Sequence, residues 1–390
     1  MRRALELAER GRGLTAPNPC VGAVVVRNGE IVGEGYHQKA GSRHAEIAAL
    51  KQAGPQAKGA SLYVTLEPCC HTGRTGPCTT AIIAAGIREV YFAMIDPNPL
   101  VNGQGARILR KAGLLVRKGL LRTEAERLNE IYCNRFVGKR PFVILKSAQT
   151  LDGRIACANG RSQWISGQQS RKLAHRLRAE VDAVVLGSRA AEIDNPQLTV
   201  RHVKGENPYR IVLSTEAGVS PDLRLFTDNA DKRTILVTCK DSLPQPLRKS
   251  RGLCWWTVKR AGGRLDLEDF LTKARSFGIN SILVEGGGRL ATDFLKLGLV
   301  DKHIVIIAPL TLGSGIDAVG ALNSRDVSEA VTYDAVVFTP IGGDVMFTGY
   351  PQPRQIAEVN TTTTHEKAGL GKRKVVTVSS DTRAQISRTR

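Results

Sequence analysis

The chain contains 390 residues, of which 42% are hydrophobic and 24% are charged. This length exceeds what one hydrophobic core usually supports, so it predicts two compact domains and excludes a single small binding module. No apolar run approaches the ~20 residues that span a bilayer, and residues 1–10 have the pattern of an amphipathic helix, not of a signal peptide. We therefore expect a globular cytoplasmic protein that does not bind membranes.

The net charge is +20, from 56 Lys and Arg against 36 Asp and Glu. From Gln352 onward there are eight basic and three acidic residues, which leaves +15 for the first 351 residues. A positive field attracts phosphorylated small molecules and polynucleotides alike, so charge does not distinguish these partners. Residues 352–390 lack aromatic residues and are rich in Thr, Arg, Lys and Ser, which predicts a basic, disordered tail.

The first part of the chain alternates between strand-like and helix-like segments. Asn28-Gly29 separates two apolar runs, which is the pattern of a β-hairpin with a tight turn. A helix is expected over 42–53, with Ser42 as its N-cap. The full set of elements is a layered α/β unit: strands at 21–26, 31–35, 60–65 and 89–94, and helices at 42–53 and 79–85.

The segment Gly138-Lys139-Arg140-Pro141 has the turn and charge content of a domain boundary. Beyond it, apolar and β-branched runs predict a second, mainly parallel sheet with strands at 142–145, 183–186, 210–213, 234–237, 281–284 and 303–307. The sequence therefore predicts a first domain at 1–138, a second at 139–351 and a tail at 352–390.

Three of the eight cysteines, Cys69, Cys70 and Cys78, lie within ten residues, whereas the other five are scattered and are expected to be small core residues. Cytosolic proteins rarely hold disulfides, so the cluster predicts metal binding. His44 and Glu46 lie upstream at the start of the helix expected over 42–53. Side chains two apart on a helix point about 200° apart, which suits Glu46 as a proton carrier better than as a second ligand.

One histidine and two thiolates leave the fourth position of a tetrahedral zinc ion open, as in catalytic sites. The set of His44, Cys69 and Cys78 therefore predicts hydrolytic deamination of a heterocycle, with Glu46 moving the proton. The zinc base deaminases use H-x-E followed by P-C-x-x-C, whereas here eight residues separate the cysteines.

An alternative is a closed structural zinc site with Cys69, Cys78 and one of Cys70, His71 or His44 among its ligands. It leaves Glu46 beside the site without a role. His37 is interpreted as an ordinary polar residue.

Taken together, the motifs at 15–25, 33–37, 44–46, 65–69 and 73–78 resemble the RibD family of bifunctional riboflavin-biosynthesis enzymes, whose cysteine spacing matches this chain. The resemblance implies a cytidine-deaminase-like α/β/α sandwich followed by a dihydrofolate-reductase-like α/β domain. It also implies one Zn²⁺ held by His44, Cys69 and Cys78, Glu46 as the proton donor, and Asn18 beside the pyrimidine.

In the second domain, Glu285-Gly286-Gly287-Gly288 follows a predicted strand and opens a helix, a geometry suited to phosphate. The alternative is a tight turn that needs glycine only for its backbone angles. The resemblance implies NADPH contacts at Ala148, Trp164, Ala190, Asp194, Thr215, Gly287, Gly288, Arg289, Leu290, Ala291, Thr292 and Asp293. It implies substrate contacts at Ser162, Leu198, Arg201 and Glu285, with Arg201 suited to a phosphate. Lys146 and Asp152 are expected in the same cleft.

Two departures from the family pattern concern the cofactor. Ala190 lacks a hydroxyl that family members commonly carry, and Ser214-Thr215 replaces an Asp-Ser pair. Because hydride transfer depends mainly on orientation, we expect these changes to alter cofactor affinity before they abolish the reaction.

The implied function has two steps. The first is deamination of 2,5-diamino-6-(5-phosphoribosylamino)pyrimidin-4(3H)-one, and the second is NADPH-dependent reduction that gives 5-amino-6-(5-phosphoribitylamino)uracil. The implied partner is thus a phosphorylated pyrimidine and not a nucleic acid, and a homo-oligomer is left open. One alternative is a nucleic-acid base deaminase, which needs no reductase-like domain. Another is a zinc-stabilised RNA-binding protein, for which 5% aromatic residues offer little base stacking.

Overall fold

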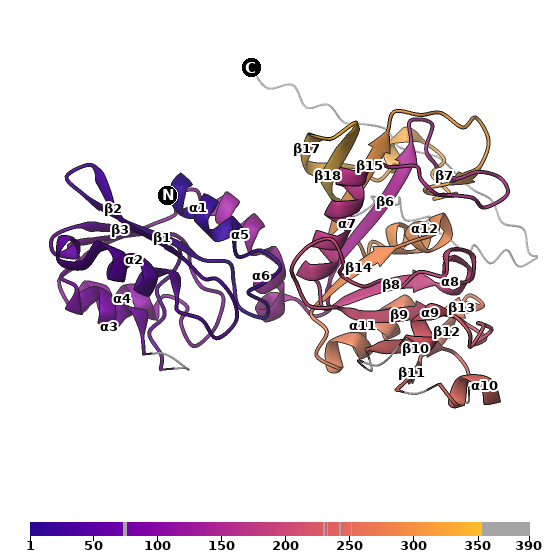
Figure 1. Ribbon diagram of the computed structural model, residues 1–390, viewed down its shortest axis with the longest axis horizontal. Helices are drawn as coiled ribbons and strands as arrows, with labels where there is room; N and C mark the ends of the chain where they lie inside the picture. Colours follow the sequence, from indigo (N-terminus) through magenta and orange to yellow (C-terminus); the bar gives the residue numbers. More distant parts are fainter. Residues whose placement is uncertain (73–75, 229–230, 232, 242, 251, 353–390) are drawn as a thin grey trace, which may run out of the picture.

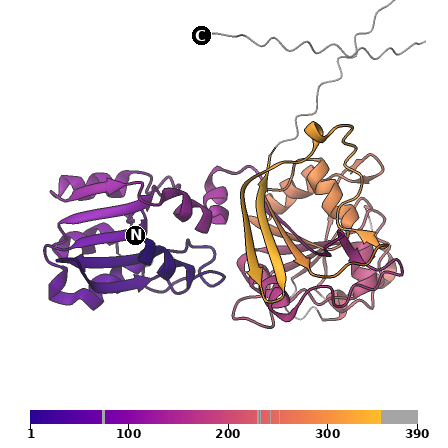
Figure 2. The ribbon, with the colours of Figure 1, turned by 90° about the horizontal axis from the view of Figure 1, so that it is seen from above.

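The computed structural model describes residues 1–352 except 73–75, 229–230, 232, 242 and 251. It contains two large sheets, one of five strands in the N-terminal half and one of nine in the C-terminal half, and the two halves lie side by side (Figures 1 and 2). The tail predicted at 352–390 falls outside the described residues from 353 onward. Within the described part, every helix is too short or too polar to cross a membrane.

The N-terminal sheet has the order β2-β1-β3-β4-β5, in which β2, β1 and β3 pair antiparallel and β3, β4 and β5 pair parallel. Helix α1 packs on Val24 at one face, and α2 packs on Ala23 and Val25 at the other. The strands are β1 (Gly22–Arg27), β2 (Glu30–Tyr36), β3 (Ser61–Leu66), β4 (Glu89–Met94) and β5 (Leu115–Lys118). The helices are α1 (Arg2–Glu9), α2 (Ala45–Ala53), η1 (Gly54–Ala57), α3 (Cys78–Ala84), α4 (Gln104–Lys111), α5 (Arg122–Leu128) and α6 (Glu130–Val137).

The elements predicted in this half are present with one correction, and the prediction missed β5, α4, α5 and α6. Asn28 and Gly29 both have positive φ, at 51° and 86°, as a tight hairpin turn requires. The helix predicted from Ser42, however, begins at Ala45, with His44 as its N-cap. The Ser42 hydroxyl instead donates to the Lys39 carbonyl oxygen at 2.7 Å, so it closes a preceding turn and cannot cap the helix.

Helix α2 lies unusually close to β2 because two glycines face it. A Cβ at Gly33 would come within 2.2 Å of the Ala49 carbonyl oxygen, and one at Gly35 within 2.4 Å of that of Ala45. Any side chain at either position would push the helix outward. This contact fixes the first turn of α2, which carries His44 and Glu46.

The C-terminal sheet has the order β11-β10-β9-β8-β14-β6-β15-β18-β17. The first seven strands in this order pair parallel, whereas β18 pairs antiparallel with both β15 and β17. Its strands are β6 (Phe142–Thr150), β8 (Ala183–Gly187), β9 (Tyr209–Leu213), β10 (Thr234–Thr238), β11 (Cys254–Thr257), β14 (Ser281–Glu285), β15 (Lys302–Ala308), β17 (Tyr333–Ile341) and β18 (Asp344–Pro351). All six predicted strands are present. The sequence prediction missed β11, β17 and β18; β17 contains an apolar run at 335–338, although most of its residues are exposed.

Helices cover both faces of this sheet. α11 and α12 pack on one face, and α7 and α8 pack on the other. The remaining elements of this half are α7 (Gln168–Glu180), α8 (Ser188–Asp194), α9 (Arg224–Thr227), α10 (Gln245–Arg248), α11 (Leu267–Ser276), α12 (Gly288–Lys296), η2 (Val327–Glu329), β7 (Arg154–Ala156), β12 (Arg260–Ala261), β13 (Arg264–Leu265) and β16 (Ile316–Asp317). The carboxyl ends of β9, β8 and β14 meet at one edge, where such sheets bind ligands.

Polar side chains join the two halves. Glu130, the first residue of α6, accepts from Lys302 Nζ and from the Tyr350 hydroxyl, both at 2.6 Å. A second ion pair links Arg12 Nε to Glu180 Oε2 at 3.9 Å. A domain boundary between residues 138 and 139 stays a prediction.

Candidate active sites

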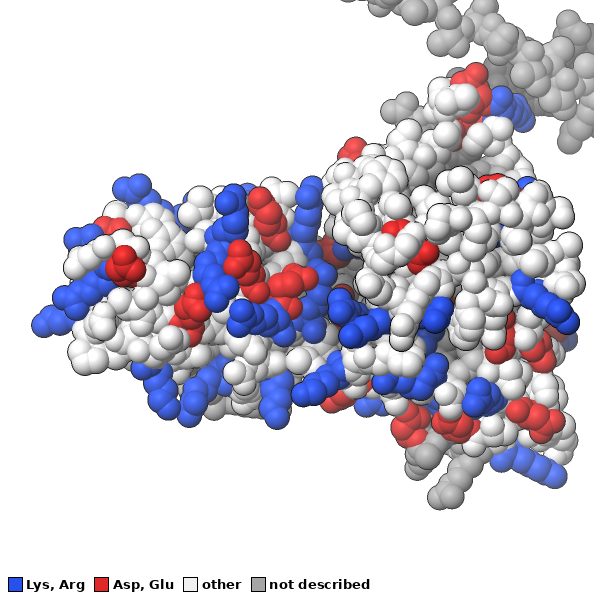
Figure 3. All heavy atoms as spheres, turned by 45° about the horizontal axis from the view of Figure 1, so that its top comes forward, with Lys and Arg blue, Asp and Glu red and all other residues white. Residues whose placement is uncertain are grey.

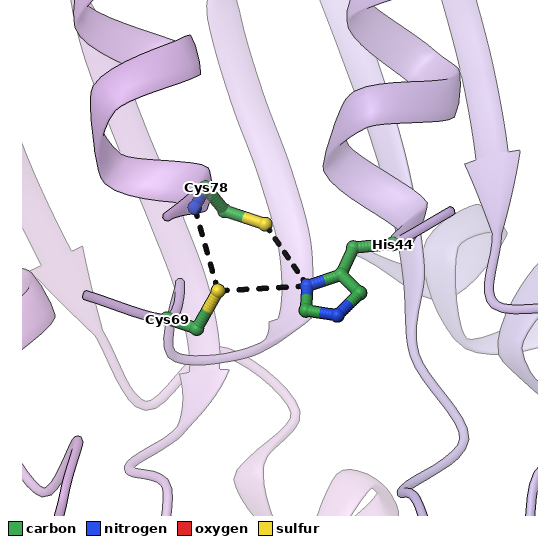
Figure 4. Close-up of side chains that lie close together, drawn as sticks. All are labelled: His44, Cys69 and Cys78. Atoms are coloured by element: carbon green, nitrogen blue, oxygen red, sulfur yellow. Dashed lines mark hydrogen bonds between the residues drawn. The ribbon is translucent and has the colours of Figure 1, made fainter. Parts of the chain in front are cut away.

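His44, Cys69 and Cys78 converge between the start of α2 and the start of α3 (Figure 4). His44 Nδ1 lies 3.2 Å from Cys78 Sγ and 3.5 Å from Cys69 Sγ, and the three ligand atoms lie within 4.8 Å of one another. These three residues are the group that could hold a metal ion within the described part of the chain. One nitrogen and two sulfurs in this spacing match the donor types that zinc prefers.

The charge balance of this group also fits a cation. The Cys78 thiol and the His44 ring hold the pKa of Cys69 low, at about 4. The Cys69 thiolate in turn raises the pKa of Cys78. A positive ion between the two sulfurs would therefore favour the loss of both protons.

Cys69 sits in a loop that a buried carboxylate anchors. Glu67, which follows β3, accepts from the backbone N–H of Gly103 at 2.8 Å and of Ala106 at 3.0 Å. This ties the loop to the start of α4, and the sequence analysis did not identify it. In the sequence, Glu67 belongs to the motif at 65–69 and directly follows an apolar strand, but neither feature indicated this anchoring role.

Glu46 lies in the first turn of α2, with 4% of its surface exposed. Burial, together with the charge of Cys69, raises its pKa to about 7. A carboxyl group with such a pKa can both accept and release a proton near neutral pH. Its side chain also interacts with that of Cys78, so it lies beside the ligand group.

Cys70 and His71 lie apart from the three ligand atoms. The Cys70 thiol donates to the Leu100 carbonyl oxygen at 3.5 Å, and His71 Nδ1 is buried without a hydrogen-bond partner. Neither belongs to the cluster formed by the described residues, which leaves the three-ligand set predicted from the sequence. Residues 73–75, part of the motif at 73–78, are outside the described residues.

Asn18 and His37 form a pair next to this group. Asn18 Nδ2 lies 3.1 Å from His37 Nε2, and His37 Nδ1 lies 3.1 Å from the Arg43 carbonyl oxygen. The His37 ring is buried and its centroid is 5.8 Å from that of His44. The sequence interpretation treated His37 as an ordinary polar residue, whereas the structure places it beside His44. The motif at 33–37, which contains His37, was the sequence signal for this position.

The second candidate site is a cavity of about 1370 Å³ at the carboxyl edge of the C-terminal sheet. Single drug-sized ligands occupy roughly 300–1,000 Å³, so this volume suits two adjacent ligands. Most of the cofactor and substrate residues predicted in this domain line the cavity: Lys146, Ala148, Ser162, Trp164, Ala190, Asp194, Leu198, Arg201, Thr215, Glu285, Gly287, Gly288, Arg289, Leu290 and Asp293.

Two predicted cofactor residues lie elsewhere, because α12 turns them away. Ala291 is 2% exposed and belongs to the hydrophobic core. The Thr292 hydroxyl donates to the Gly288 carbonyl oxygen and accepts from the Gly320 N–H. Asp152 is also outside the cavity lining: it accepts from the N–H groups of Leu312 and Gly313 and so anchors that loop.

A charged group forms the centre of the cavity wall. Arg178 on α7 pairs with Glu285 through Nε–Oε1 at 2.7 Å and Nη2–Oε2 at 2.9 Å. Despite burial, which acts in the opposite direction, this guanidinium holds the pKa of Glu285 below its usual value. Burial lowers the pKa of the neighbouring Lys146. Arg178 was missed because nothing marks it within a helix rich in basic residues.

Arg201 lies at the same cavity, where Nη1 donates to Gln197 Oε1 at 2.8 Å and to Thr199 Oγ1 at 2.9 Å. Its backbone N–H donates to His175 Nδ1 at 3.2 Å. Burial, with the charges of Arg178 and Arg201, lowers the pKa of His175 to about 4, so this ring is neutral at pH 7. The guanidinium is thus held over the cavity by neutral partners and keeps its charge for an anion.

Backbone requirements explain two of the three glycines after β14. Gly286 has φ of +118°, and a Cβ at Gly288 would come within 2.0 Å of the Asp317 carbonyl oxygen. Gly287 has open space around it and is the N-cap of α12. The tight-turn alternative therefore accounts for Gly286, close packing against Asp317 accounts for Gly288, and Gly287 offers an open approach to the helix start.

Known proteins share both halves. Residues 1–94 match the family described as cytidine and deoxycytidylate deaminase zinc-binding region, and residues 141–347 match the RibD C-terminal domain. The fold and sites thus define a zinc-binding deaminase joined to a reductase. The chain belongs to the RibD family of riboflavin biosynthesis proteins and is a bifunctional enzyme of that pathway.

Individual relatives match over nearly their whole length. The riboflavin biosynthesis protein RibD of Aquifex aeolicus is 44% identical over 347 residues, which cover 89% of this chain and 96% of that protein. RibD of Escherichia coli is 44% identical over 327 residues, covering 80% and 88%. The solved structure of Acinetobacter baumannii RibD has a TM-score of 0.78 at 33% identity, and covers 90% of this chain and 98% of its own.

A further solved structure, from Thermotoga maritima, is described as a diaminohydroxyphosphoribosylaminopyrimidine deaminase/5-amino-6-(5-phosphoribosylamino)uracil reductase. It has a TM-score of 0.77 at 36% identity, and covers 90% of this chain and 97% of its own. The similarities do not favour a nucleic-acid base deaminase or an RNA-binding protein. On the face drawn in Figure 3, Lys and Arg are interspersed with Asp and Glu over both halves.

Proposed function

We propose that the N-terminal half deaminates 2,5-diamino-6-(5-phosphoribosylamino)pyrimidin-4(3H)-one and that the C-terminal half then reduces its ribosyl group with NADPH. The product is 5-amino-6-(5-phosphoribitylamino)uracil. The observation that carries the proposal is the presence of two chemically distinct sites, a His/Cys/Cys group beside a buried carboxyl and a large cationic cleft. We place the division between the halves at residues 138/139.

In the first site, His44, Cys69 and Cys78 would hold one zinc ion. When bound, zinc acts as a Lewis acid and brings the pKa of water to about 7. Glu46 takes up a proton from water and delivers it to the leaving amine, a role that its burial beside the ligand group supports. Asn18, held by His37, orients the pyrimidine through its amide.

In the second site, the cleft would hold NADPH and the phosphorylated pyrimidine together. When bound, NADPH supplies a hydride. The open helix start at Gly287 suits a pyrophosphate, and the guanidinium of Arg201 suits the substrate phosphate. Glu285 and Lys146 lie on neighbouring strands and orient the sugar, with Arg178 holding the Glu285 carboxylate.

The experiment follows ammonia release and NADPH absorbance separately after the purified protein is mixed with the diaminopyrimidine substrate. We expect ammonia release without NADPH, and NADPH oxidation only after deamination or with the deaminated intermediate. Deamination of single-stranded oligonucleotides without NADPH oxidation would contradict the proposal. The cytoplasmic location and the oligomeric state stay predictions.

A further inference from the structure

One end of the reductase cavity is closed by a small hairpin and helix α12. The hairpin consists of β12 and β13, and Ala261, Arg264 and Leu265 from it line the cavity. Facing it, one side of α12 and its C-cap contribute Leu290, Asp293, Lys296 and Leu297. Along α12 this end follows the helix start at Gly287, whereas Arg178 and Arg201 come from other elements, α7 and the segment after α8.

An ion pair spans the two walls here. Arg264 Nη1 donates to Asp293 Oδ1 at 2.6 Å and to Oδ2 at 2.8 Å. Nη1 is the nitrogen of the guanidinium that contacts the carboxylate, and among the described residues Nε and Nη2 have no hydrogen-bond partner. About half of the Arg264 side chain is exposed, so its remaining donors are accessible to a ligand in the cavity.

Each phosphate of the two proposed ligands needs its own binding group in the cleft. Arg201 is suited to the substrate phosphate, and the N–H groups at the start of α12 to the pyrophosphate of the cofactor. NADPH carries one more phosphate, on the ribose of its adenosine half, and this group is its only difference from NADH. Proteins that use NADPH commonly meet this phosphate with an arginine. Neither of the first two phosphates requires Arg264. Other cations also line the cavity, namely Arg171, Arg189, Arg224, Arg289 and Lys296. Arg264 is set apart from them by its ion pair with Asp293, which holds its guanidinium between the hairpin and α12.

We propose that Arg264 binds the phosphate on the adenosine ribose and thereby makes the enzyme select NADPH over NADH. The inference rests on the proposed reductase function. Asp293 then serves to hold the guanidinium over the cavity while the adenosine site is empty. Because a carboxylate repels a phosphate, Asp293 is the partner of Arg264 and not itself a phosphate contact.

Equilibrium binding of NADPH and of NADH to the full-length protein, measured by titration calorimetry, tests this proposal. In the Arg264→Gln variant we expect the affinity for NADPH to fall by about 10- to 100-fold, the worth of a charged hydrogen bond, while NADH binding changes less than twofold. The matched control is Arg260→Gln, on the same hairpin but outside the cavity lining, which should leave both affinities unchanged. The pair of adenosine 2′,5′-bisphosphate and AMP should repeat the NADPH and NADH pattern without the nicotinamide.

Other outcomes overturn the inference. Equal losses of NADPH and NADH binding in Arg264→Gln would mean that the residue only shapes the wall, and unchanged binding would exclude the contact. Asp293→Asn keeps an amide oxygen that can accept from Arg264 but removes the charge that repels the phosphate, so it should increase the preference for NADPH, and a decrease would contradict the account even if Arg264→Gln fails to fold. A wild-type protein that binds both cofactors equally would refute the selectivity alone, whereas one that binds neither would refute the proposed reductase function.

Discussion

Arg178 and Glu285 form a two-bond ion pair in the wall of the reductase cavity, with both side chains about one-eighth exposed. The pair joins α7 to the end of β14, so it fixes where the Glu285 carboxylate stands relative to Lys146 on the neighbouring strand. A lysine at position 178 would keep the charge but lose the planar fork. The geometry of this carboxylate, and not only its charge, therefore depends on arginine.

Replacing Arg178 by lysine should accordingly slow NADPH-dependent reduction by at least about tenfold, because a single misdirected contact of ~1.4 kcal/mol has that effect. Ammonia release should stay within twofold of the wild-type rate, since this pair lies in the other half of the chain. The two rates are measured on one preparation with the two assays described above. Reduction at the wild-type rate would show that the Glu285 carboxylate does not need both bonds from Arg178.

Glu46→Gln should lower the rate of ammonia release by about 10²- to 10⁴-fold, the usual contribution of a positioned acid-base group. The amide keeps the size of the side chain but cannot carry the proton. Zinc content and reduction of the deaminated intermediate serve as controls and should not change. An unaltered rate of ammonia release would remove Glu46 from the proton-carrier role.

Arg201→Ala should weaken use of the phosphorylated substrate by ~1.5–3 kcal/mol, the scale of a hydrogen bond to a charged group. Steady-state kinetics of the reduction step should show this as a raised KM. A substrate analogue without the phosphate provides the matched control, because Arg201 then has no anion to bind. An unchanged KM for the phosphorylated substrate would remove Arg201 from the phosphate site.

His303 predicts how the stability of the protein depends on pH. It is buried on β15, its Nδ1 lies 2.8 Å from the Tyr333 hydroxyl, and burial lowers its pKa from 6.5 to about 4. The His303 ring binds a proton more readily in the unfolded chain than in the folded protein. The free energy of unfolding is therefore unaffected by this ring above pH 6.5 and decreases as the pH falls from 6.5 toward 4. The loss between pH 7.5 and pH 5 is roughly 2 kcal/mol.

Urea unfolding at pH 7.5 and pH 5 measures this loss, and His303→Gln provides the comparison, because glutamine does not titrate. The difference in unfolding free energy between the two pH values should be smaller in the variant by about the same amount. Equal differences in both proteins would mean that His303 does not contribute to the acid sensitivity.

Short-range patterns predicted much of the fold. The turn at Asn28-Gly29 and the six buried strands of the second sheet could be identified because each depends on a few neighbouring residues. The start of α2 could not, since Ser42 bonds to Lys39 instead of capping the helix. Strand β17 was missed although it carries an apolar run at 335–338, and most of its residues are exposed.

The candidate sites divide in the same way. His44, Cys69 and Cys78 could be predicted because metal ligands are chemically distinctive, and their convergence in space agrees with the prediction. Ala291 and Thr292 were included in a continuous run although a helix turns only some of its residues toward a ligand. Arg178 and Glu67 were missed because their importance comes from partners distant in sequence, Glu285 and the start of α4.

The central claim is an open zinc site held by one nitrogen and two sulfurs. X-ray absorption at the zinc edge on the active, full-length protein tests it most directly, because it reports the elements and distances around the ion. We expect one zinc per chain with two sulfur neighbours near 2.3 Å and one nitrogen and one oxygen near 2.0–2.1 Å. A shell of four protein ligands with a third sulfur from Cys70, or full ammonia-releasing activity in a preparation without zinc, would contradict the account.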